Sequence, residues 1–186
     1  MDIYKKTTKL CVLGMLSALS IVLVFLVRIP ILPEAPYLEY DPADIPILIA
    51  AYLYGPYSAI AVTFVVCVIQ GITVSASSGI IGILMHFFAT GALSITVGML
   101  SERGRFNIRT FFAAIAGAVM MVLIMIPLNM VFTPMYTGFS TKTICSMILP
   151  IFIPFNTLKS GINTVVSMII YGALIPALKL KKDTKC

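Results

Sequence analysis

The residues of this chain that could do chemistry inside a membrane gather in one stretch, PFNTLKSGIN, at positions 154–163. At about 100° per residue in a helix, Asn156, Lys159 and Asn163 fall on one face, together with two serines, within an arc about 100° wide. Apolar residues cover the other faces. Because lipid offers no hydrogen bonds, the polar face must turn toward the interior of a helix bundle or toward a cavity.

This polar face could also arise in two ways that involve no ligand. Lys159 could extend to the membrane surface, since a helix that begins at Pro154 places it only about 8 Å deep. The asparagines could simply hold helices together. We favour a binding pocket, because amides lie one turn before and one turn after the lysine on its own face. Lys159 has no acidic neighbour in its helix, so it needs carbonyl oxygens, an acidic loop residue or a ligand acceptor.

A further amide, Asn129 in IPLNMVFTPMY, is expected near the end of the preceding helix and could face the same cavity. Three amides and one cation supply paired donors and acceptors with little negative charge. Such a site suits a neutral, flat, polar molecule with carbonyl and imide edges, and it suits a metal ion or a cationic compound poorly. We therefore predict no metal site and no resident cofactor.

The composition identifies the setting of these residues. The 186 residues are 60% apolar and 11% charged, with a mean hydropathy of +1.05, which is typical of an integral membrane protein. The net charge of +6 comes from basic residues that flank apolar runs, so we predict no nucleic-acid binding. Four scattered cysteines predict neither disulfides nor a zinc site. Because the sequence has no phosphate-binding loop motif, we do not expect this chain to hydrolyse ATP by itself.

The apolar runs predict a single membrane domain, residues 1–186. The block 45–72 could form one kinked helix or two helices broken at Gly55–Pro56. Six crossings place ten of the thirteen lysines and arginines on the cytoplasmic side, whereas five would send seven of those ten outside. We therefore predict an all-α bundle of six helices with both termini cytoplasmic. The predicted helices are approximately 8–28, 44–54, 57–72, 79–101, 108–132 and 154–179, with a loop at 133–149.

The second helix is then short, about 16 Å at 1.5 Å per residue, and cannot cross the bilayer alone. The preceding segment RIPILPEAPYLEYDPAD is rich in proline and acidic residues, so it is expected to be an ordered loop that folds over the outer face. An ordinary connecting loop is the alternative. Asp44, just before Pro46, could simply cap the short helix.

Three segments, YLEYDPADIPILIAAYLYGP, SSGIIGILMHFFATGALSITVGML and PFNTLKSGIN, occur in an order that resembles the riboflavin-specific substrate-binding subunits of energy-coupling-factor (ECF) vitamin transporters. The similarity covers residues 8–180. It implies a multi-pass subunit in a bacterial cell membrane that binds riboflavin from outside and has no enzymatic activity. It also implies a transmembrane coupling subunit and two cytoplasmic ATPases as partners, and a rotation in the membrane that releases the vitamin inward.

The match also implies site residues. Asn129, Asn156 and Lys159 would hold polar edges of the vitamin, the first outer loop would cover it, and a serine–glycine pair would contribute backbone groups. With the polar face, the expected binding residues are Leu38, Tyr40, Asp41, Ser78, Gly79, Asn129, Asn156, Lys159 and Asn163.

Two residues near the predicted site carry expectations of their own. His86 stands where this family more often has asparagine. We expect it to be a core residue with its hydrogen bonds satisfied, with a ligand contact as the alternative. Glu39 places a negative charge beside the site, which disfavours phosphorylated flavins.

Gly14 and Ala18 in CVLGMLSALSIV are spaced so that another helix could approach closely. Packing within the chain would account for this spacing, whereas the resemblance favours docking of the coupling subunit.

Three other functions are weighed against riboflavin binding. A related subunit for thiamine would want a buried carboxylate opposite its cation, whereas the polar face offers a lysine. An integral membrane enzyme acting on a lipid would need paired acids, a nucleophile with a base, or a metal cluster, and none of these is visible in the predicted spans. A purely structural subunit would have no use for the polar face.

Overall fold

The computed structural model describes residues 2–33, 35–75 and 79–177, and side chains from residue 6 onward. The six predicted helices are all present within these ranges. Four helical segments, Lys6–Leu26, Gly79–Leu100, Ile108–Thr137 and Thr141–Ala177, are long and apolar enough to cross a membrane. The helices are α1 (Asp2–Leu26), α2 (Asp44–Tyr54), α3 (Pro56–Ile72), α4 (Gly79–Leu100), α5 (Ile108–Thr137), α6 (Thr141–Met147), the π segment η2 (Ile148–Phe152) and α7 (Ile153–Ala177).

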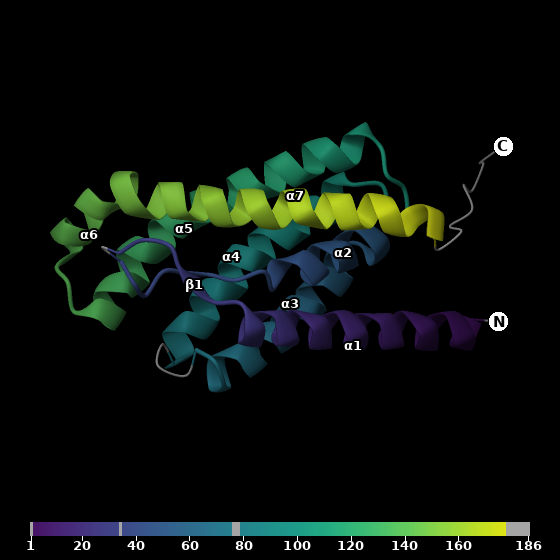
Figure 1. Ribbon diagram of the computed structural model, residues 1–186, viewed down its shortest axis with the longest axis horizontal. Coiled ribbons are helices and arrows are strands. Elements are labelled where there is room, and N and C mark those ends of the chain that lie inside the picture. The colour runs from purple at the N-terminus through teal and green to yellow at the C-terminus, as the bar shows by residue number, and fades with distance from the viewer. Residues whose placement is uncertain (1, 34, 76–78, 178–186) are drawn as a thin grey trace.

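The helices form an elongated bundle (Figure 1). The start of α1 and the end of α7 lie at the same end, which we call the terminal end, and we call the opposite end the distal end. Helix α4 packs between α3 and α5, and α7 packs against α5 and α2. The long helices α1, α4, α5 and α7 run in alternating directions between the two ends (Figure 1).

Helix α2 lies in the interior of the bundle. All residues from Asp44 to Tyr52 are buried, so this 11-residue helix has no lipid-facing side. Gly55 joins it to α3 with a φ of 82°, a value that favours glycine, and Pro56 begins the next helix. A Cβ on Gly98 would lie 2.6 Å from the Pro56 nitrogen, so glycine at this position lets α4 approach the turn.

The segment between α5 and α7 corrects the predicted loop at 133–149. Helix α5 continues through Pro134 to Thr137, and α6 runs through η2 into α7 without a break. Pro134 and Pro150 each lie within a helical segment. Pro150 lies in η2, where the widened hydrogen-bond pattern accommodates a residue that has no N–H. Residues 178 and 179 of the last predicted helix lie outside the described ranges.

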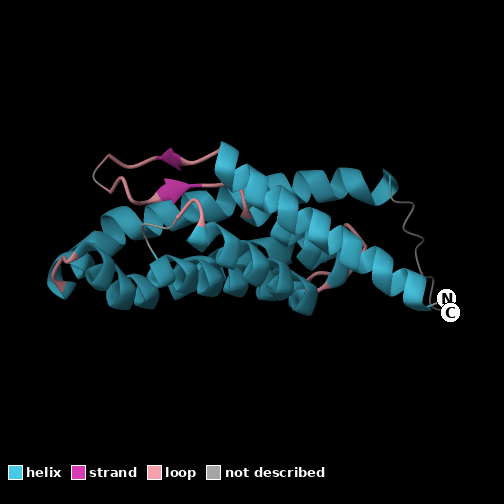
Figure 2. Cartoon of the chain, turned by 90° about the horizontal axis from the view of Figure 1, so that it is seen from below, coloured by secondary structure: helices cyan, strands magenta, loops and turns pink. Residues whose placement is uncertain are grey.

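The predicted ordered loop contains a two-residue antiparallel ladder of β1 (Ile29–Pro30) and β2 (Glu39–Tyr40) (Figure 2). Helix α1 ends at Leu26, so Arg28 belongs to this loop. The Arg28 guanidinium forms an ion pair with Glu39 and donates to the Val74 carbonyl, 2.5 Å away, in the α3–α4 connection. One arginine thus joins the two connections at the distal end.

The small residues of α1 lie on its exposed face. Gly14 and Ala18 are both exposed, and nothing lies within 4 Å of a Cβ built on Gly14. Neighbouring Ser17 points the other way, is buried, and donates to the Leu13 carbonyl. The small residues are therefore not used for packing within the described chain.

Candidate functional site

A cavity opens inside the distal half of the bundle, between the loop before α2 and helices α3, α4, α5 and α7. The wall from α5 and α7 is polar and includes Asn129, Asn156 and Lys159. The opposite wall, from α3 and α4, includes Gln70 and His86. Methionines and aromatic rings complete the lining. The cavity thus combines apolar surface with a few convergent polar groups, the usual composition of a small-molecule site.

The polar face of α7 points into the bundle, as its pattern predicts. Asn156, Lys159 and Asn163 are all at least 94% buried. The Lys159 ammonium does not extend to the surface: its Nζ lies 2.7 Å from Oδ2 of Asp41. Among the partners that the sequence left open for this lysine, the structure selects an acidic residue of the loop before α2.

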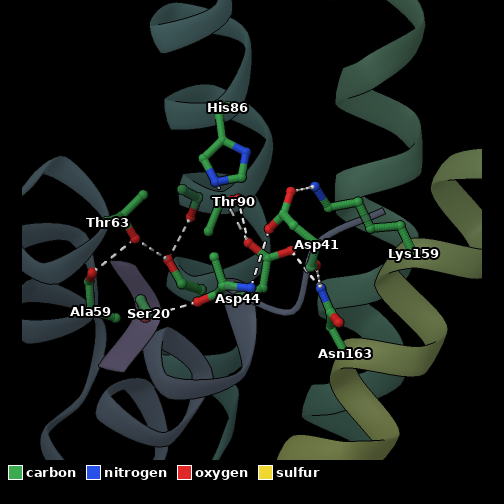
Figure 3. A network of polar contacts seen from close by, with 12 residues as sticks. Ser20, Asp41, Asp44, Ala59, Thr63, His86, Thr90, Lys159 and Asn163 are labelled. Carbon is green, nitrogen blue, oxygen red and sulfur yellow. Dashed lines mark hydrogen bonds and ion pairs between the residues drawn. The ribbon is translucent and has the colours of Figure 1, made fainter. Parts of the chain in front are cut away.

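Asp41 and Asp44 are the centre of a buried network (Figure 3). Asp44 accepts hydrogen bonds from Thr90 Oγ1 at 2.7 Å and from Asn163 Nδ2 at 3.0 Å. Asn163 Nδ2 also donates to the Asp41 carbonyl at 3.0 Å. We call Asp41, Asp44, Thr90, Lys159 and Asn163 the carboxylate network. It ties α2 to α4 and α7 through residues up to 122 positions apart.

This network corrects two predictions. The site is not poor in negative charge, because two carboxylates are buried beside the single ammonium. Asp44 does not cap α2: the N-cap position is Ala43, which makes no side-chain cap, and the Asp44 carboxylate is engaged by α4 and α7.

The ionised form of Asp41 is stabilised by its surroundings. Burial alone would raise the pKa of this carboxyl, but the Lys159 ammonium and the backbone N–H of Ala43, 3.1 Å from Oδ1, together hold the pKa below its usual range. Asp41 and Lys159 therefore form a buried ion pair in which each charge depends on the other.

The two remaining amides of the polar wall are held by their own helices. Asn129 Nδ2 donates to the Met125 carbonyl at 2.7 Å, and its Oδ1 accepts from Thr133 Oγ1 at 2.9 Å. Asn156 Nδ2 donates to the Phe152 carbonyl at 2.7 Å, within the π segment. These bonds fix the orientation of both amides at the cavity wall.

Three buried polar atoms on the cavity lining have no hydrogen-bond partner in the described part of the chain. They are the hydroxyl of Tyr37, Oε1 of Gln70 and Nε2 of His86. Unpartnered buried polar groups are uncommon in folded proteins, so three around one cavity indicate that the cavity receives another polar molecule. His86 was expected to be a satisfied core residue, and that prediction was wrong.

The predicted binding residues separate into groups. Leu38, Asp41, Asn129, Asn156 and Lys159 line the cavity together.

Tyr40 and Asn163 lie behind the cavity wall, joined by a 2.9 Å hydrogen bond from the tyrosine hydroxyl to the amide oxygen. Gly79 begins α4 with a φ of 53° and does not line the cavity. Ser78 lies outside the described residues.

Reasoning from the sequence missed three residues that matter at the cavity: Gln70, Arg28 and Asp44. Gln70 could have been found, because a glutamine near the end of an otherwise apolar run needs a hydrogen-bond partner inside the membrane. Arg28 and Asp44 gave none, because their roles depend on contacts 46 positions away in the chain. Glu39 was expected to add negative charge beside the site, but Arg28 pairs with it.

Comparisons with known proteins agree with this architecture. A family model described as the substrate-specific component of the ECF transporter matches residues 8–171. The riboflavin transporter FmnP of Bacillus subtilis (strain 168) is 30% identical over 187 residues, covering 96% of this chain and 97% of that protein. The riboflavin transporter RibU of Streptococcus thermophilus is 26% identical, covering 90% of this chain and 83% of that protein.

A solved structure, described as the S component of a bacterial ECF transporter, superimposes with a TM-score of 0.80 at 26% identity. The match covers 94% of this chain and 99% of that one.

Proposed function

We propose, starting from the fact that this chain belongs to the substrate-specific components of ECF transporters, that the cargo it binds is riboflavin. The chain is a multi-pass protein of a bacterial cell membrane and a non-enzymatic transport subunit. Components of this family associate with an energy-coupling module.

The observation that carries the riboflavin proposal is the distal cavity and the order of its polar groups. Amides and an ammonium line one part of the cavity, the Gln70 oxygen and the His86 imidazole line another, and methionines and aromatic rings complete the lining. A flat ring with imide and carbonyl edges and a hydroxylated side chain offers both walls the partners they need. The names of the curated relatives support the same cargo.

A cationic vitamin such as thiamine fits this cavity less well. The carboxylates that line the cavity, Glu39 and Asp41, are already paired with Arg28 and Lys159. Asp44 has neither a lysine nor an arginine within ion-pair distance among the described residues, but it lies behind the cavity wall. A cationic ring would therefore meet positive groups and no free carboxylate.

The direct test is a titration of purified protein with riboflavin, followed by quenching of flavin fluorescence. Asn156→Leu and Asn129→Leu should each weaken binding by about 1–3 kcal/mol, because each leaves a polar group of the cargo without its partner. Thr96→Val is the matched control, since this residue bonds within α4 and does not line the cavity. The proposal is overturned if the wild-type protein does not quench riboflavin fluorescence, or if it binds thiamine and not riboflavin.

We further propose that the distal end faces the outside and that both termini are cytoplasmic. This orientation rests on ten basic residues that, in the sequence, precede the first span, join α4 to α5 or follow the last span. A thiol reagent that cannot cross membranes should label exposed Cys145 in intact cells and spare Cys186. The assay is made in a Cys11→Ser background, because Cys11 is exposed on α1. Labelling of Cys186 in intact cells would reverse the orientation.

The exposed small residues of α1 are proposed as the docking face for the coupling subunit. Gly14→Leu with Ala18→Leu should abolish riboflavin uptake in cells while leaving binding by the isolated protein unchanged. Ala61→Leu, on an exposed position of α3, is the matched control. If the double variant also loses binding of riboflavin, the two residues belong to the fold, and this docking proposal fails.

A further inference from the structure

His86 is a buried residue that the fold does not use. It projects from α4 with 14% of its side chain exposed, and it lines the cavity. Its Nε2 is buried without a hydrogen-bond partner among the described residues. The nearest charged atom recorded for it is Oδ1 of Asp44, 3.9 Å from Nε2, which is too long for a hydrogen bond.

Asp44 is held in place independently of His86. Thr90 donates to one carboxylate oxygen and Asn163 donates to the other, so the carboxylate keeps its position whatever the imidazole does. The histidine is therefore not required to complete the carboxylate network.

The position of Asp44 nevertheless selects a tautomer of the imidazole. Nε2 faces a carboxylate oxygen, and an N–H in that position is attracted while a lone pair is repelled. With the proton on Nε2, Nδ1 carries a lone pair and can only accept a hydrogen bond. Figure 3 shows this second ring nitrogen turned away from Asp44, toward the side on which Lys159 lies.

The rest of the cavity explains the need for an acceptor at this point. Lys159 can only donate, so one side of the cavity offers an ammonium group to the cargo. Gln70, which lines the same cavity, presents an unpartnered oxygen from α3. The two walls therefore differ in hydrogen-bonding character: Lys159 offers a donor, whereas the α3–α4 wall offers acceptors for the N–H or O–H groups of a bound molecule.

We infer that His86 is a specificity-determining residue whose Nδ1 accepts a hydrogen bond from a donor group of the cargo, with Asp44 fixing the tautomer. For a flavin the donor is the imide N–H or a hydroxyl of the side chain. The inference rests on the proposed binding of riboflavin in this cavity, and it adds a contact on the wall opposite Asn156 and Lys159.

The experiment is a riboflavin titration of full-length purified protein at pH 8, with His86→Leu and His86→Asn as the variants. At pH 8, His86→Leu should weaken binding about tenfold, and His86→Asn, whose amide oxygen can accept, should stay within about threefold of wild type.

Thermal unfolding of each variant in the same detergent checks that it is folded, and His86→Asn keeps the test valid if His86→Leu does not fold. Unchanged binding by folded His86→Leu, or a loss of more than about threefold in folded His86→Asn, overturns the inference while leaving the proposed function intact. Failure of the wild type to bind riboflavin overturns the proposed function first.

Discussion

Asp44 in the carboxylate network and Gln70 on the cavity wall are both buried polar residues in an apolar bundle, but they differ in what they contact. Asp44 has a donor on each of its oxygens, supplied by helices far along the chain. The side-chain oxygen of Gln70 has no partner among the described residues, and neither has Nε2 of His86 or the hydroxyl of Tyr37. We call these last three the unpartnered wall residues.

The difference separates residues that hold the fold from residues that await a ligand. A buried polar group that is satisfied within the chain contributes to stability and is costly to disturb. One that is left unsatisfied costs stability in the empty protein and regains it when a ligand supplies the missing partner. Substitutions in the carboxylate network should therefore lower stability, and substitutions of the unpartnered wall residues should lower binding.

The largest expected effect is in the carboxylate network, at its ion pair. Lys159→Met leaves the Asp41 carboxylate buried without its cation, so the free energy of unfolding should fall by about 3–5 kcal/mol. The double variant Lys159→Met with Asp41→Asn removes both charges and should recover most of that loss. Thermal unfolding in detergent measures both. Equal instability of the single and double variants would mean that the pair does not hold the fold.

A smaller loss should follow when the amide that serves both aspartates is removed. Asn163→Leu takes away the donor to Asp44 Oδ2 and to the Asp41 carbonyl, at an expected cost of about 2–3 kcal/mol in unfolding free energy. Thr164→Val is a neighbouring control, since the Thr164 hydroxyl has no partner among the described residues. If both variants are equally stable, Asn163 is not part of a structural network.

The unpartnered wall residues should show the opposite pattern. Gln70→Leu removes an oxygen with no partner in the empty protein, so stability should be unchanged or slightly higher. Riboflavin binding should weaken by about 1–2 kcal/mol, measured by fluorescence titration at a fixed pH. A Gln70→Leu protein that unfolds more easily but binds normally would remove the distinction between the two groups of residues.

The smallest effect concerns acid. Because the pKa of Asp41 is lowered in the folded protein, its contribution to stability is complete above the unfolded value, near pH 4, and is lost as the pH falls through the folded value. The stability difference between wild type and the Lys159→Met, Asp41→Asn double variant should stay constant from pH 8 to pH 5. It should change only below about pH 4. A change in that difference above pH 5 would show that another group controls the pair.

Much of the bundle follows from local sequence. Long apolar runs give the four longest helices, and the Gly55–Pro56 pair marks the turn between α2 and α3. The polar face of α7 could be predicted as buried because its residues repeat at helical spacing, and that prediction is confirmed. These features depend on residues only a few positions apart.

The rest depends on contacts that no local pattern specifies. Lys159 needed an acceptor, but its choice of Asp41, 118 positions away, is decided by how the outer loop folds over α7. The segment 133–149 was predicted to be a loop but is largely helical, because the effect of Pro134 on a helix depends on how its neighbours satisfy the freed carbonyl group. His86 looked satisfied because nothing in its own segment shows that it points into a cavity.

The burial of α2 on every side also has a consequence for how the protein is made. Eleven residues are too few for the insertion machinery to take up as a span, so α2 must enter the membrane together with α3 as a hairpin closed at Gly55. Asn163, which donates a hydrogen bond to Asp44, lies in the last helix and is synthesised 119 residues after it. Until α7 leaves the ribosome, the centre of the bundle is incomplete. A nascent chain stalled before α7 should therefore be a far better substrate for membrane proteases than the finished protein.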